Sequence, residues 1–182
     1  MNRLKEKYLK EAVVKAKKEL GAGNIMSVPQ IIKICINSGI GPFRDNREAV
    51  ESFSEEMGNI AGQKPFPRKA KKSEAGFKIK QGDVVGFAVT LRKERMWAFL
   101  DKLINIALPR VRDFRGLSVE AFDKNGNYSL GVREHVIFPE VNPNTTKGIR
   151  GLQVTINFNS HDRAKNKYVL ENLGFPFEKD GE

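Results

Sequence analysis

Three separated segments alternate between apolar and polar residues, and this period of two constrains the fold more than any other feature. The segments are residues 31–38, 85–92 and 152–158. Such alternation is typical of strands with one buried side and one open side. The apolar side consists of Ile32, Ile34, Ile36, Phe87, Val89, Leu91, Leu152, Val154, Ile156 and Phe158. This side has to be covered by other elements of the fold.

Four other segments carry apolar residues at spacings of three and four, which predicts helices that can cover the sheet. The first spans residues 3–20, with apolar positions up to Leu20 and a stop at Gly21, and the second is capped by Asp45 or Asn46 and carries Val50, Phe53, Met57 and Ile60. The others span 94–108, ended by Pro109, and about 161–172, ended at Gly174. Their irregular interleaving with the strands predicts an α+β fold: a mixed or antiparallel sheet with helices packed on one face and a polar opposite face.

The connections also have recognisable signals. Asn125-Gly126, between Val119–Phe122 and Tyr128–Val132, predicts a hairpin or a tight reversal. Residues 142–148 are expected to form an exposed loop. The length of 182 residues predicts a single domain, residues 1–182, with a protruding basic loop at about 70–83.

Charge and cysteine usage limit the class of protein. The net charge of +10 favours acidic partners, meaning nucleic acid or an anionic membrane. A single cysteine, Cys35, excludes an internal disulfide and fits a reducing compartment. Apolar runs stay well short of the roughly 20 residues that a spanning helix needs, and Met1–Lys7 lacks a signal-peptide core, so we expect a soluble intracellular protein.

The stretch from Lys64 to Asp83 holds seven cations against two anions, Glu74 and Asp83. Its two prolines and two glycines predict a short strand that runs into a long basic loop. A solvated charged loop is the ordinary interpretation. A polyphosphate surface is the alternative, because each neutralised phosphate releases condensed counterions.

The polar side of the three strands is rich in amides and hydroxyls: Lys33, Asn37, Thr90, Arg92, Gln153, Thr155 and Asn157. It can be an ordinary solvated face. Short hydrogen-bonding groups flanked by cationic loops also suit RNA sugars, phosphates and base edges. The strands lack the aromatic pair of an RNA recognition motif, which favours binding by shape to a folded RNA.

A second basic cluster, Arg110, Arg112 and Arg115, follows the helix at 94–108. These arginines can complement the helix dipole, or they can supply bidentate phosphate contacts.

Enzyme motifs are not found. Gly39-Ile40-Gly41 follows a strand, but Arg44 stands where a dinucleotide-binding motif needs its third glycine. His135, His161 and Cys35 are far apart in the sequence, so neither a metal site nor a cofactor is expected. Trp97 is interpreted as a packing residue.

Several long motifs resemble one family. They are Ile60-Ala61-Gly62-Gln63-Lys64-Pro65, Lys69-Ala70-Lys71-Lys72-Ser73, Ala75-Gly76-Phe77-Lys78-Ile79, Leu108-Pro109-Arg110-Val111-Arg112-Asp113-Phe114-Arg115-Gly116 and Leu173-Gly174-Phe175-Pro176-Phe177. Together they resemble bacterial large-subunit ribosomal protein L-five, essentially end to end. The chain departs from the family at Phe66-Pro67-Arg68, where the family has smaller aliphatic residues and a threonine, and residues 142–148 are not closely matched.

The resemblance implies a non-enzymatic, ribosome-bound cytoplasmic protein of the central protuberance. The implied partners are 5S rRNA, 23S rRNA, P-site tRNA, the small-subunit head protein S-thirteen and neighbouring large-subunit proteins, with no membrane. It implies 5S rRNA contact by Lys33, Asn37, Gln63, Lys64, Thr90 and Arg92, and tRNA contact by Lys71, Lys72, Ser73, Lys78 and Lys80. Arg110, Arg112 and Arg115, with residues 134–148, are implied in rRNA or intersubunit-bridge contacts.

Two other classes remain open at this point. One is a general RNA chaperone or regulatory RNA binder that acts away from the ribosome. The other is a membrane-surface protein that binds through the basic N-terminal helix, whose apolar stripe lacks large anchoring side chains.

Overall fold

The computed structural model describes residues 2–19 and 24–178. These residues form two compact units. Unit 1 consists of the described residues within 1–34, 91–130 and 155–182, and unit 2 consists of residues 35–90 and 131–154. The single domain expected from the length therefore stays a prediction.

The strands form one five-stranded sheet in the order β2-β3-β1-β5-β4. They are β1 (Ile31–Gly39), β2 (Phe66–Lys69), β3 (Val84–Leu91), β4 (Tyr128–Val132) and β5 (Leu152–Phe158). The three alternating segments of the sequence form β1, β3 and β5, and the α+β fold is confirmed. The edge strand β2 pairs with β3 in antiparallel orientation.

The expected inward side is confirmed with one correction. Ile34, Ile36, Phe87, Val89, Leu91, Leu152, Val154, Ile156 and Phe158 are buried. Ile32 is 46% exposed, and its neighbour Ile31 is buried in its place. Because both residues are isoleucines, the sequence pattern cannot show where the alternation changes phase.

In unit 1, a helical segment runs from Arg3 to Glu19 through α1 (Arg3–Lys7), a π-helical turn (Tyr8–Ala12) and α2 (Val13–Glu19). The expected end of this helix at Leu20 and Gly21 lies outside the described residues. Tyr8 packs against Trp97, with ring centroids 5.1 Å apart. Trp97 is 6% exposed, so its interpretation as a packing residue is confirmed.

The other helices of unit 1 end close to the predicted residues. α4 (Lys93–Lys102) continues into a π-helical turn (Leu103–Ala107) and a 3-10 turn (Leu108–Arg110) that contains Pro109. α5 (Arg163–Leu173) begins after Asp162, whose side chain caps it, and ends at Gly174, which is left-handed with φ 96°. Among the helices of residues 2–19 and 24–178, none combines the length and apolar character that spanning a membrane would require.

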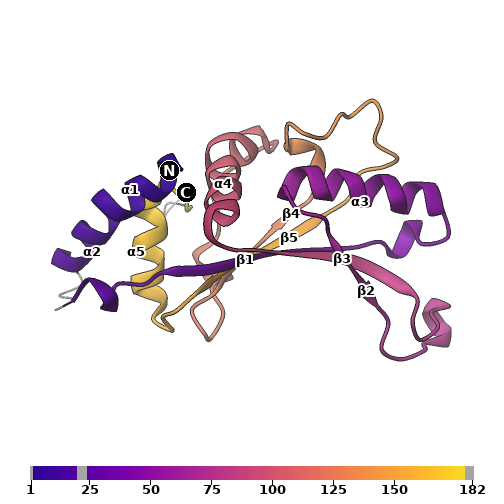
Figure 1. The fold of residues 1–182 in the computed structure, drawn as a ribbon, viewed down its shortest axis with the longest axis horizontal. Coiled ribbons are helices and arrows are strands. Elements are labelled where there is room, and N and C mark those ends of the chain that lie inside the picture. Colours follow the sequence, from indigo (N-terminus) through magenta and orange to yellow (C-terminus); the bar gives the residue numbers. More distant parts are fainter. Residues whose placement is uncertain (1, 20–23, 179–182) are drawn as a thin grey trace. The chain divides into compact units, whose positions relative to one another are not determined.

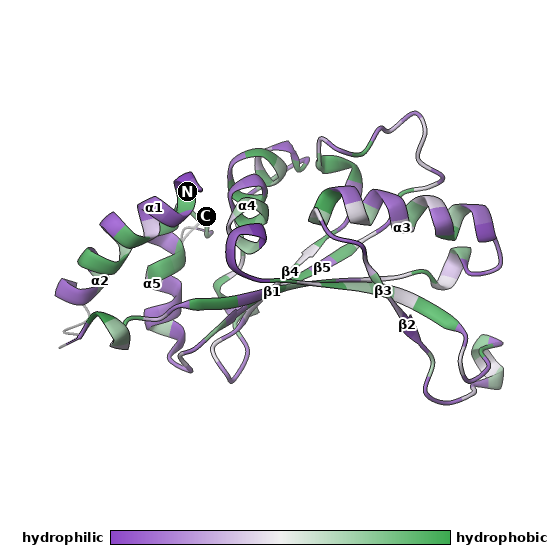
Figure 2. Cartoon of the chain, in the orientation of Figure 1, coloured by the Kyte–Doolittle hydropathy of each residue, from purple (hydrophilic) through white to green (hydrophobic). Residues whose placement is uncertain are grey.

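In unit 2, α3 (Arg47–Ala61) covers one side of β1 and β3 (Figure 1). Asn46 caps it by accepting a hydrogen bond from the backbone N–H of Ala49 at 3.1 Å, which selects Asn46 over Asp45. Phe53 is fully buried and lies 6.3 Å from Phe87 of β3 between ring centroids. In Figure 2 the strand β3 is mostly green to white while β2 is purple, as expected for a strand under a helix beside a polar edge.

A buried polar cluster holds residues 134–150 of unit 2 to α3. The Nδ1 atom of His135 accepts a hydrogen bond from the backbone N–H of Arg150 at 3.1 Å. Nε2 must therefore carry the proton, and it donates to the Glu56 carboxylate at 2.9 Å. This arrangement fixes the neutral tautomer of a histidine that has no exposed surface.

Arg150 fastens the neighbouring loop. Its guanidinium donates to the carbonyl oxygens of Lys147, Gly148 and Ala49 at 3.0, 3.2 and 3.4 Å. It also lies over the rings of Phe43 and Phe53, with Cζ 4.3 and 4.8 Å from their centroids. Burial lowers the pKa of Arg150 from its ordinary value, and the nearby Glu56 carboxylate opposes this shift. The C-terminal end of the loop predicted at 142–148 is thus tied to α3.

The reversal predicted at Asn125-Gly126 is confirmed, but the first strand of a hairpin is not formed. Val119–Ala121 is a 3-10 turn, because Ser118 accepts a hydrogen bond from the backbone N–H of Glu120 at 3.2 Å. The approach to the turn keeps only the isolated bridge between Phe122 and Tyr128. Gly126 is left-handed, with φ 76°.

Gly126→Ala is expected to destabilise the protein by about 2 kcal/mol or more, because alanine disfavours this φ and its Cβ finds no space. A Cβ there would lie 2.6 Å from Nδ2 of Asn166 and 2.8 Å from the carbonyl oxygen of Ser160. Asn166 cannot withdraw, since Nδ2 donates to the carbonyl oxygens of Gly126 and Ser160. Urea unfolding measures the change. Gly131→Ala is the control, because nothing lies within 4 Å of its Cβ position. Equal losses in the two variants would contradict the steric argument.

Arg150→Met is expected to lower the free energy of unfolding by about 2–4 kcal/mol, because three carbonyl groups lose a charged donor. Amide hydrogen exchange should also speed up between residues 145 and 150. The matched control is Arg133→Met, which changes an exposed arginine of the same unit. Unchanged exchange in the Arg150 variant would show that the loop is held by other contacts.

Candidate nucleic-acid interface

We call the side of β1 and β3 opposite α3, within unit 2, the open face. Asn37 of β1 and Thr90 of β3 are both exposed there. Cys35, two residues before Asn37 on β1, lies close to Thr90, with Sγ 3.9 Å from Oγ1 of Thr90. α3, the one α-helix formed by the described residues of unit 2, packs on the other side against Phe87. The open face therefore presents short polar groups that no α-helix of this unit covers.

Lys33 and Arg92 continue the alternation along the same two strands, at positions that belong to unit 1. Lys33 is half-buried on β1, two residues before Cys35. Arg92 follows the last residue of β3 in extended backbone, with φ −139°, and is exposed. Each side chain is thus accessible to a ligand at the end of its own strand.

Gln63 and Lys64 lie in the segment that connects α3 to β2. Gly62 ends the helix in the left-handed region, with φ 64°, and the backbone N–H of Gln63 then donates to the carbonyl oxygen of Gly58 at 3.2 Å. Both residues line a shallow depression beside the C-terminal half of α3, together with Ser54 and Asn59. The structure therefore places them beside the helix, at a depression that neither Asn37 nor Thr90 lines.

The basic loop, residues 70–83, is folded by its own backbone. Glu74 and Ile79 exchange two backbone hydrogen bonds of 2.9 and 3.1 Å around a 3-10 turn at Ala75–Phe77. At the base, Ala70 donates to the carbonyl oxygen of Asp83 at 2.8 Å, and Gly82 donates to that of Ala70 at 3.0 Å. These hydrogen bonds join the two arms of the loop into a small hairpin.

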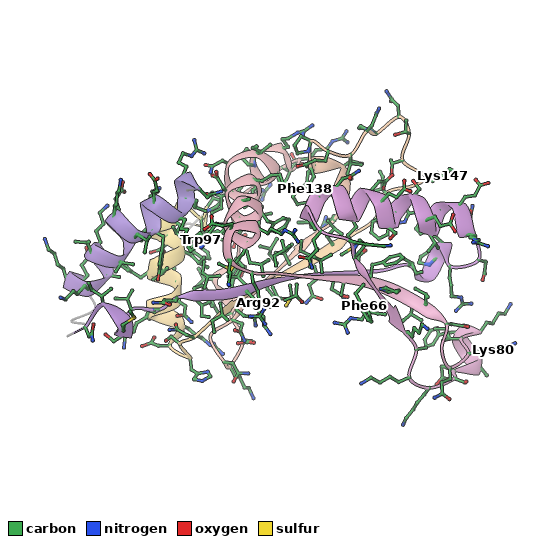
Figure 3. All side chains as sticks on the ribbon, viewed as in Figure 1. Phe66, Lys80, Arg92, Trp97, Phe138 and Lys147 are labelled. Carbon is green, nitrogen blue, oxygen red and sulfur yellow. The ribbon has the colours of Figure 1, made fainter. Side chains whose placement is uncertain are left out.

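This hairpin holds its cations outward. Lys71, Lys72, Lys78 and Lys80 are all exposed, and Figure 3 shows Lys80 extending from the loop. Ser73 stabilises the loop itself, because its Oγ accepts a hydrogen bond from the backbone N–H of Gln81 at 2.9 Å. The Asp83 carboxylate likewise accepts from the backbone N–H of Lys80 at 2.8 Å.

Two further arginines lie near the base of this loop, and the sequence pattern did not single them out. Arg44 donates to the carbonyl oxygen of Phe77 at 3.4 Å. Arg44 and Arg47 line a depression of about 520 Å³ together with Lys78 and Lys80. The carboxylates of Asp45, Glu51 and Asp83 line the same depression, so its net charge is small.

Arg110, Arg112 and Arg115 are exposed in unit 1, after the helical path of α4 has ended. The chain bends there through Asp113, with φ 51°, and Gly116, with φ 111°. The next residue, Leu117, donates to the carbonyl oxygen of Pro176 at 2.9 Å and accepts from Glu178 at 3.1 Å. The C-terminal segment therefore fixes one end of this arginine cluster.

The histidines and the cysteine of the described residues do not gather into a metal site. Within residues 2–19 and 24–178, no three His, Cys, Asp or Glu side chains lie close enough to share a metal ion. His135, the buried histidine, is engaged by Glu56 and Arg150. Sequence patterns missed the cluster of His135, Glu56 and Arg150, because these residues are widely separated in the chain and none belongs to a motif.

Comparisons with known proteins show the family to which the chain belongs. Residues 24–80 match the family described as ribosomal protein L5, and residues 84–177 match the family described as its C-terminus. The large ribosomal subunit protein uL5 of Geobacter sulfurreducens is 50% identical over 177 residues, which cover 97% of this chain and 99% of that protein. The uL5 proteins of Geotalea uraniireducens and Dichelobacter nodosus are 49% and 46% identical over the same shares. The chain therefore belongs to the ribosomal protein L5 family, whose members are structural, non-enzymatic components of the large ribosomal subunit.

Proposed function

We propose that this chain binds 5S rRNA and the adjacent 23S rRNA in the central protuberance of the large subunit, and that the open face is its 5S rRNA surface. The observation that carries the proposal is the exposure of Asn37 and Thr90 on the neighbouring strands β1 and β3, opposite the side that α3 seals. An amide and a hydroxyl can each donate and accept, so they suit sugar hydroxyls, phosphates and base edges at once.

Affinity and register come from different residues in this mechanism. Lys33, Lys64 and Arg92 neutralise phosphates, which provides most of the affinity and its salt dependence. Asn37 and Thr90 fix the register of the folded RNA by directional hydrogen bonds. Contact with Gln63 and Lys64 requires the RNA to reach the segment between α3 and β2.

The basic loop is proposed to contact P-site tRNA. Its backbone hydrogen bonds hold the exposed Lys71, Lys72, Lys78 and Lys80 on a hairpin, which would lower the entropy lost on binding. Ser73 supports this loop through Gln81.

The remaining surfaces are proposed to meet other parts of the ribosome. Arg110, Arg112 and Arg115 would contact rRNA or, with residues 134–148, the small-subunit head protein S-thirteen in an intersubunit bridge. Neighbouring large-subunit proteins complete the set of partners. The protein would then function as a part of the ribosome in the bacterial cytoplasm.

Combining Asn37→Ala with Thr90→Ala is expected to weaken 5S rRNA binding about 10- to 30-fold, since each lost hydrogen bond is worth about 1 kcal/mol. The thermal unfolding temperature should not change, because neither side chain belongs to the buried side. Filter binding at fixed salt measures the affinity. The control is Asn144→Ala with Thr145→Ala, an exposed pair of the same residue types in unit 2. Unchanged affinity in the Asn37–Thr90 variant would refute the open face as the 5S rRNA surface.

Changing Lys71, Lys72, Lys78 and Lys80 together to Gln is expected to leave 5S rRNA affinity within about twofold and to reduce P-site tRNA occupancy on reconstituted ribosomes. The control carries the same charge change at four exposed lysines of the N-terminal helical segment, Lys10, Lys15, Lys17 and Lys18. It should retain tRNA occupancy. An equal loss of 5S rRNA affinity in the loop variant would show that the loop belongs to the 5S rRNA surface.

A further inference from the structure

The edge strand β2 carries an exposed aromatic ring whose side of the sheet is fixed by strand register. Phe66 pairs with Ala88, Pro67 with Phe87, and Arg68 with Gly86. Partners directly opposite in an antiparallel pair point to the same side of the sheet. Because Phe87 packs under Phe53 of α3, Phe66 and Arg68 point to the open face. Figure 3 shows Phe66 on the side of β2 away from α3.

This ring has little to pack against. Phe66 is 64% exposed, and its cross-strand neighbours on the open face, Ala88 and Gly86, are small. Leaving such a ring in water forgoes about 2 kcal/mol of burial free energy. Arg68 lies over it, with Cζ 5.6 Å from the ring centroid, so a cation accompanies the exposed aromatic surface.

The surroundings point to an anionic partner that offers a flat ring. Between Gly62 and Ser73 the chain has five cations, Lys64, Arg68, Lys69, Lys71 and Lys72, and no acidic residue. A strand of another protein is disfavoured at this edge, because Pro67 lacks a backbone N–H and the pairing register shifts between Arg68 and Lys69. An unpaired RNA nucleotide meets both requirements, since it carries an aromatic base and an anionic phosphate.

We propose that Phe66 and Arg68 form a stacking site for one unpaired base of the RNA that occupies the open face. The base lies on the Phe66 ring, and Arg68 contacts the phosphate of the same nucleotide. This inference rests on the proposed function of the open face and adds to it a single-stranded nucleotide at the β2 edge. One ring gives one stacked base, in keeping with a face that otherwise reads a folded RNA by shape.

The experiment compares Phe66→Leu and Phe66→Tyr in the full-length protein, titrated with 5S rRNA. Phe66→Leu should weaken binding about tenfold, in the range measured for loss of one base–aromatic stack, whereas Phe66→Tyr should stay within about twofold. The slope of affinity against salt should be unchanged in Phe66→Leu and reduced by about one in Arg68→Gln. The chain supplies a matched control in Phe77→Leu, because Phe77 is 74% exposed but lies on the basic loop.

Chemical probing of the RNA identifies the nucleotide. One unpaired base should be protected by the wild-type protein and reactive with Phe66→Leu. Wild-type affinity of Phe66→Leu, or equal weakening by Phe77→Leu, would overturn the stacking site while the Asn37–Thr90 result still supports the open face. If the Asn37–Thr90 variant also binds normally, both the open face and the stacking site are refuted.

Discussion

Burial of one side of β1 and β3 beneath α3 is the constraint on which the candidate site depends. Ile36, Phe53 and Met57 have no exposed surface, so the register of these strands is fixed by the core and not by any ligand. A slip of one residue would turn Asn37 and Thr90 inward and bring apolar side chains to the surface. The apolar core of unit 2 therefore orients the hydrogen-bonding groups before RNA arrives.

The basic loop is stabilised in a different way, because its cations repel one another and it has no apolar core of its own. Its backbone hydrogen bonds close a small hairpin, and Ser73 and Asp83 satisfy two further N–H groups. The carboxylate of Asp83 sits within the loop, where it offsets part of the repulsion. The loop can thus be cationic on the outside and ordered at the same time.

Periodicity was enough to predict β1, β3, β5 and the four helical segments, because each buries one side at a regular spacing. It could not choose between Ile31 and Ile32, which are chemically identical, or foresee that Ser118 would turn Val119–Ala121 into a 3-10 turn. The polar side of the strands followed from the same alternation that predicted the core. The cluster of His135, Glu56 and Arg150 could not be found in this way, since its residues meet only through tertiary packing.

Strand register adds information that residue type alone does not carry. Phe66 in the sequence is only an apolar residue beside two prolines, and its meaning depends on which side of β2 it occupies. Pairing of Pro67 with the buried Phe87 decides that question and places the ring on the side of Thr90. The open face then combines two means of recognition. Hydrogen bonds require one geometry of the RNA, whereas stacking accepts any base that is free to leave its helix. A folded RNA with one unstacked nucleotide satisfies both, and a regular duplex satisfies only the first.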